Sequence, residues 1–103
     1  MMNVQENIKK LENIKENIEG GSLLQVAYEI NAVANSIDIT CDEVTNTINN
    51  SEVVDEGSLL KIEYLLQADM SLGELSRSIS ENNIPSNAKE IIDSVSSILE
   101  EMA

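Results

Sequence analysis

Cys41 is the single thiol of this chain and the residue best suited to nucleophilic or redox chemistry. A cysteine reacts as its thiolate, which a cationic neighbour or a histidine base favours. The residues that follow Cys41 are Asp42 and Glu43, whose negative charges disfavour a thiolate, and the chain contains no histidine. We therefore expect Cys41 to be a structural residue that packs against the core.

Asp38, Thr40 and Asp42 alternate as the first ligands of a calcium-binding loop do. Such a loop requires glycine where this chain has Glu43, and a bidentate glutamate where it has Asn49. No cluster of cysteine and histidine is present for zinc. Because a nucleophile motif and a glycine-rich phosphate loop are also missing, we predict no metal, no cofactor, no catalytic residues and no enzymatic activity.

Tyr28 and Tyr64 are the only aromatic residues. Two aromatic side chains do not make a platform on which nucleobases stack. We expect each tyrosine to lie at the edge of the core with its hydroxyl group in water, and partner binding is the alternative role.

The charge of the chain is strongly negative, with 19 acidic and 6 basic residues giving a net charge of −13. No basic residue occurs between Lys15 and Lys61. Nucleic acids and anionic membranes are bound by clustered lysine and arginine, so we expect neither as a direct partner. The acids either solvate helix surfaces or form a docking surface for a basic protein.

The densest acidic stretch runs from residue 38 to residue 56. It supplies the candidate partner-binding residues Asp38, Asp42, Glu43, Glu52, Asp55 and Glu56. Val53 and Val54 interrupt the acids, and they predict either a small docking epitope or a loop that is held against the core. A DNA-reading helix-turn-helix over residues 58–80 is not supported, because its second helix would carry only one base, Arg77.

Apolar residues at spacings of three and four predict helices throughout the chain. We expect a leading amphipathic helix over residues 3–19, ended by Gly20-Gly21, and a trailing helix over residues 86–101 that follows Pro85. No segment shows the alternation typical of a strand.

Residues 21–50 and 57–83 match each other as two diverged copies of one unit, apart from five extra residues, 33–37, in the first copy. Both copies begin Gly-Ser-Leu-Leu, and both contain a capping-box pattern, Thr40-x-x-Glu43 in one and Ser71-x-x-Glu74 in the other. The duplication predicts two pseudo-equivalent helix-turn-helix pairs. The whole chain, 1–103, is then a single all-α domain, a compact bundle of about six helices.

These features favour a non-enzymatic helical module that binds another protein, as an adaptor, an inhibitor or a small chaperone. The alternative is an acidic mimic of nucleic acid that blocks the basic groove of a DNA- or RNA-handling protein, as a phage or mobile-element antagonist does. A secreted helical effector partner is a third class, although the Trp-x-Gly turn of the best-known such family is absent. One cysteine and no apolar run of signal-peptide or membrane-spanning length predict a cytoplasmic protein, and self-association stays open.

Overall fold

The protein is built from two long and two short helices. The computed structural model describes residues 3–20, 22–51 and 55–102, and these contain no strand. The long helices are α2 (Leu23–Asn49) and α3 (Glu56–Ser80), and the short ones are α1 (Val4–Asn17) and α4 (Ala88–Glu101). The prediction of an all-helical bundle is confirmed, but the described residues form four helices rather than about six.

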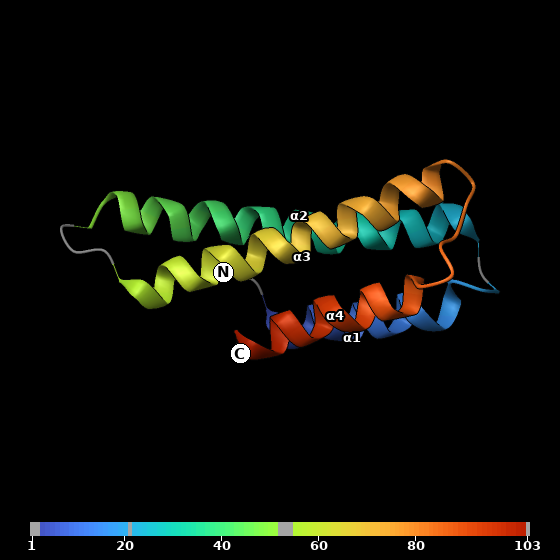
Figure 1. The fold of residues 1–103 in the computed structure, drawn as a ribbon, viewed down its shortest axis with the longest axis horizontal. Coiled ribbons are helices and arrows are strands. Elements are labelled where there is room, and N and C mark those ends of the chain that lie inside the picture. Colours follow the sequence, from blue (N-terminus) through green and yellow to red (C-terminus); the bar gives the residue numbers. More distant parts are fainter. Residues whose placement is uncertain (1–2, 21, 52–54, 103) are drawn as a thin grey trace.

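The helices form a ring in which α1 packs on α2, α2 on α3, α3 on α4, and α4 on α1. Helices α2 and α3 make a long antiparallel hairpin, and α1 and α4 lie side by side along one part of it (Figure 1). At 1.5 Å per residue, the 27 residues of α2 extend about 40 Å and the 14 residues of α4 about 21 Å. The hairpin therefore continues beyond the short helices, and the molecule measures 49 × 23 × 19 Å.

The uncovered end of the hairpin is called the arm below and comprises residues 43–49 of α2 and 56–64 of α3. Tyr64 marks its base, because the tyrosine hydroxyl donates a hydrogen bond to Glu101 in the last turn of α4. That hydrogen bond raises the pKa of Tyr64.

The leading helix agrees with its sequence pattern. The Asn3 side chain caps α1 by accepting a hydrogen bond from the backbone N–H of Glu6 at 3.1 Å. Of the apolar residues at spacings of three and four, Val4 is half-buried and the others are buried: Ile8, Leu11, Ile14 and Ile18. Helix α4 agrees in the same way, with Ile92, Val95 and Leu99 buried. Both short helices thus present one apolar stripe to the long hairpin.

The two predicted helix-turn-helix pairs are wrong, because α2 and α3 are each unbroken. Helix α2 continues through Asp38 and Thr40, and α3 continues through Ser71. Thr40 does not cap a helix; its hydroxyl donates to the carbonyl oxygen of Ser36 at 2.9 Å, one turn earlier. A threonine followed three residues later by glutamate is compatible with a helix interior, and no glycine or proline interrupts residues 38–48.

The structure does not show the predicted duplication either. Ile30 and Leu66 were matched in the alignment of the copies, yet Ile30 is fully buried and Leu66 is exposed. Ala32 and Ala68 were also matched, and here the first is exposed and the second buried. The similarity of the two segments reflects a shared apolar periodicity rather than equivalent positions in the fold.

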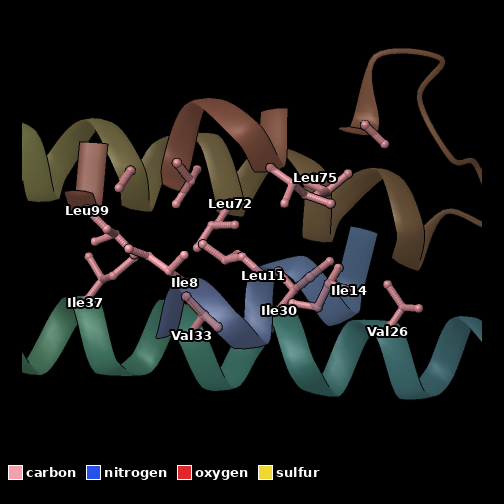
Figure 2. Close-up of a cluster of buried hydrophobic side chains, with 14 of the residues drawn as sticks. Ile8, Leu11, Ile14, Val26, Ile30, Val33, Ile37, Leu72, Leu75 and Leu99 are labelled. Carbon is pink, nitrogen blue, oxygen red and sulfur yellow. The ribbon is translucent and has the colours of Figure 1, made fainter. Parts of the chain in front are cut away.

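The core lies where all four helices run together. Figure 2 shows side chains from α1 (Leu11), α2 (Ile30, Val33) and α3 (Leu72, Leu75) converging between the ribbons. Each fully buried aliphatic side chain of this kind stabilises the fold by roughly 1.5–3 kcal/mol relative to an exposed one. Among the described residues the core contains no aromatic side chain, so its stability depends on close packing of leucine, isoleucine and valine.

Helix α3 ends in a Schellman motif. The backbone N–H of Asn83 donates to the carbonyl oxygen of Ser78, and that of Asn82 donates to Ile79, both at 2.9 Å. Asn82 has a φ of 62°, the left-handed conformation that asparagine adopts more readily than most residues. The predicted break at Asn82–Pro85 is therefore confirmed, and it turns the chain back so that α4 packs on α3.

Candidate partner-binding surface

The face of the α2–α3 hairpin that points away from α1 and α4 is called the outer face. Its seam is marked by two contacts between the helices, one from Asn31 to Ser76 and one from Asp38 to Asp69. The paired positions are seven residues apart on each helix, which is two turns, so the contacts lie on the same side of the hairpin. Residues that the helical period places on the same side of α2 or α3 as these contacts are assigned to the outer face.

Large apolar side chains gather on the outer face, where no other described part of the fold covers them. Ile39, Leu66 and Met70 retain 59%, 51% and 68% of their accessible surface. In the antiparallel register set by the Asp38–Asp69 contact, these three side chains fall at one level near the middle of the hairpin. Further exposed apolar residues that the helical period places on this face are Leu24, Tyr28 and Leu59.

Gly73 lies on the same ridge of α3. Leu66, Met70, Gly73 and Arg77 follow one another at spacings of four, three and four, which places them in one row along the helix. Gly73 is exposed and has no positive φ, and a Cβ added there would meet no atom within 4 Å. Neither the backbone conformation nor the packing within the chain therefore requires glycine at this position.

Two carboxyl groups meet at the centre of the outer face. Burial, together with a hydrogen bond to Asp38 and the charge of Asp38, raises the pKa of Asp69 to about 6. The hydrogen bond between two carboxyl groups requires a proton on one of them, because an ionised carboxylate has no hydrogen to donate. When both groups are ionised they repel each other instead. The pair is therefore a point of unrelieved negative charge at neutral pH.

The predicted acidic stretch does not form one surface. Asp38 and Asp42 lie on the outer face, whereas the helical period places Glu43 on the flank of α2 that is turned away from α3. Asp55 is the N-cap of α3: its carboxylate accepts from the backbone N–H of Gly57 at 3.1 Å and from the Ser58 hydroxyl at 3.3 Å. Ser58 is thus a hydrogen-bond partner of the cap and not the cap itself.

The remaining candidates lie near the tip of the arm. Glu56 is in the first turn of α3, where the helix dipole stabilises a negative charge. Glu52, Val53 and Val54 lie outside the described residues. Of the six candidate partner-binding residues, Asp38 and Asp42 are the ones that the structure brings together on the outer face, beside residues of α3. Partner binding by any of the six stays a prediction.

The acids of α3 were missed by sequence reasoning as part of this surface. The helical period places Glu63, Asp69 and Glu74 on the outer face. Arg77 is the only basic residue that this register places on the outer face among the described residues. If residues 56–80 are taken as one helix, its period separates Leu66, Met70 and Gly73 from the buried Leu65 and Leu72. This pattern is the sequence signal from which the outer face could have been predicted.

Basic residues are concentrated on the short helices instead. Lys15 of α1 is 2.8 Å from the carboxylate of Asp93 on α4, and Lys89 of α4 is 3.4 Å from that of Glu19. A shallow hollow between these helices is lined by Glu12, Lys15, Glu16 and Lys89. Its lysines already have carboxylate partners, so the hollow is balanced in charge while the outer face is not.

Cys41 is half-buried against the core and does not form a disulfide. Burial and the charge of Asp42 are the main causes that raise the pKa of its thiol, and the charges of Asp38 and Asp69 act in the same direction. The chemistry expected of a reactive cysteine is thus disfavoured at this position. Of the two tyrosines, Tyr28 is exposed and Tyr64 is half-buried.

Metal-ligating groups do not converge within residues 3–20, 22–51 and 55–102, where no cluster of three or more Cys, Asp or Glu side chains could hold an ion. No helix in the described part of the chain is long and apolar enough to cross a membrane. Comparisons with protein families, with curated proteins and with solved structures find no match to this chain. Any functional assignment therefore depends on the surface itself.

Proposed function

We propose that this protein is a non-enzymatic helical module that binds another protein and acts as an adaptor, an inhibitor or a small chaperone. The observation that supports this proposal is the outer face of the α2–α3 hairpin, where Ile39, Leu66 and Met70 are exposed among acids. Apolar side chains that gather on one face and are ringed by polar groups are typical of protein interaction sites. The acids suit a partner with a basic surface.

A mimic of nucleic acid is the second candidate, and a specific observation favours it. Acidic side chains lie along two neighbouring ridges of one face, as phosphates lie along the two backbones of a nucleic acid duplex. These acids are Asp38, Asp42, Glu63, Asp69 and Glu74. A mimic would occupy the basic groove of a DNA- or RNA-handling protein. Its binding would depend on several ion pairs and would weaken steeply with salt.

The test is an affinity pulldown from the source organism at low and high salt, with bound proteins identified by mass spectrometry. A protein-binding module with an apolar contact should retain its partner at about 300 mM salt, where charges more than a few ångströms apart are screened. A mimic should lose its partner over the same range, and that partner should bind nucleic acid competitively. Failure to enrich any protein above a scrambled-charge control at either salt would contradict both forms of the proposal.

A further inference from the structure

We propose that the outer face of the α2–α3 hairpin binds a basic amphipathic helix of the partner, which lies across the α3 ridge at Gly73. The inference rests on the proposed protein-binding function and adds the location of the site and the chemistry of its ligand. Three independent features of the described residues carry it: the exposed apolar side chains, the glycine and the imbalance of charge.

The apolar feature sets what the partner must present. Leu66 and Met70 are one turn apart on α3, and Ile39 faces the same level from α2. An exposed helix ridge with apolar side chains one turn apart can pack against an amphipathic helix, which contributes its own residues at spacings of three and four. An extended peptide has no open sheet edge to pair with here, because the described residues are all helix, turn or loop.

The glycine sets how closely the partner approaches. A glycine inside a helix costs about 1 kcal/mol relative to alanine, so a protein gains nothing from Gly73 unless the missing side chain is useful. Nothing inside the described fold uses it, since a Cβ would stand in open space. Small residues at a helix crossing allow two backbones to approach closely, and Gly73 lies one turn from Met70 on the outer ridge.

The negative charge of the outer face favours a basic partner and disfavours a second copy of this chain. The outer face carries Asp38, Asp42, Glu63, Asp69 and Glu74 against Arg77 alone among the described residues. Two copies joined through this face would bring these acids together, and like charges at an interface oppose association. A lysine or arginine from a partner would instead lie beside the Asp38–Asp69 pair and relieve its repulsion.

The probe is a set of three designed helical peptides of about 20 residues, a length that spans about 30 Å. The peptides share one leucine face and differ in their flanking residues, which are lysine, glutamine or glutamate. Binding to the full chain is measured by fluorescence anisotropy at about 50 mM and 300 mM salt. The lysine peptide should bind at least about tenfold more tightly than the glutamate peptide, with the glutamine peptide between them.

Matched variants locate the site. Gly73→Gln adds a side chain at the proposed crossing, and Ser97→Gln adds the same side chain to an exposed position of α4 on the opposite side of the ring. Gly73→Gln should leave the melting temperature equal or higher and weaken the lysine peptide about tenfold or more, whereas Ser97→Gln should change neither. Met70→Gln should weaken binding in the same direction. Asp42→Asn should weaken it more than Glu90→Gln on α4, although each removes one charge.

Several results would overturn the inference. Equal binding by all three peptides, no measurable binding at low salt, or binding unaffected by Gly73→Gln would each refute it. A dimer of the chain alone in sedimentation velocity that Gly73→Gln makes monomeric would assign the face to a second copy. If the pulldown partner is retained equally by Gly73→Gln and Ser97→Gln, the protein-binding function stands and this location is wrong. If the pulldown finds no partner, the protein-binding function fails, whatever the peptides do.

Discussion

Replacing Asp69 by asparagine should stabilise the protein at neutral pH. The asparagine would keep the size of the side chain, and its amide would donate to the Asp38 carboxylate, as Asp69 does only when it is protonated, at a pH below its pKa of about 6. The pKa of Asp69 is raised from an ordinary 3.8 to about 6. Without solvent screening, a pKa shift of that size corresponds to a free-energy difference of about 3 kcal/mol between the two protonation states. Because the side chain is only half-buried, solvent screening reduces the expected gain to about 1 kcal/mol.

The pH dependence follows from the direction of the displacement. A raised pKa means that the folded state holds the proton more tightly than the unfolded state, so the pair costs stability as pH rises from about 4 to 6. The cost keeps growing as pH passes through the pKa of about 6 and is complete about one pH unit above it. The advantage of Asp69→Asn should therefore be small at about pH 4, grow through about pH 6 and level off between about pH 7 and pH 8. A gain of about 1 kcal/mol raises the melting temperature of a domain of this size by about 4–8 °C.

The assay is thermal unfolding followed by circular dichroism at intervals between about pH 4 and pH 8. Asp42→Asn is the matched control, since it removes one charge from the same face at an exposed position of α2. Comparing the two variants separates the local pair from the general repulsion of a chain with a net charge of −13. If Asp69→Asn and Asp42→Asn show the same gain at every pH, the Asp38–Asp69 interaction is not what raises the pKa, and the argument is refuted.

Three further predictions concern the helices, and all are checked by urea unfolding of single variants. Gly73→Ala should stabilise the free protein by about 0.5–1 kcal/mol, because alanine favours a helix and the added methyl group meets no atom; a loss would mean that the added methyl group meets a neighbour after all. Asp55→Ala should cost about 1 kcal/mol by removing the cap of α3, whereas Ser71→Ala should cost nothing, since Ser71 lies inside a helix. The reverse order would restore a helix start at Ser71. Asn82→Val should cost about 1–2 kcal/mol, because its φ of 62° disfavours a branched side chain, and Asn82→Gly should be neutral or better.

The parts of the fold that the sequence predicted correctly are those where local signals act alone. The buried positions of α1 and α4 follow from apolar spacing, because each short helix presents one stripe to one neighbouring layer. The end of α3 follows from the Asn82–Pro85 segment, whose residues disfavour a helix. Ser22 caps α2 as expected by accepting from the backbone N–H of Gln25, although the distance is 3.5 Å.

The errors arose where tertiary contacts decide between local alternatives. Thr40 with Glu43 is equally compatible with a helix start and with a helix interior, and packing of α2 along α3 selects the interior. A helix start at Ser71 would place Gly73 in the first turn of a new helix. Because α3 is continuous there, Gly73 instead lies with Leu66 on the outer side of one long helix. The candidate surface was thus hidden by the same mistake that produced six helices.

The inner side of the arm is the side that continues the surface covered by α1 and α4. It does not have the apolar surface that a further packed helix would need. The helical period places Thr47 and Lys61 toward that side, and both are polar and exposed. Val44 and Leu65 between them are already buried by the α2–α3 contact. A face meant to be covered by further helices would continue the apolar stripe of α2 instead. The large apolar side chains of the hairpin that stay exposed are mostly on the opposite, outer side, so a partner that covers apolar surface has more to gain there.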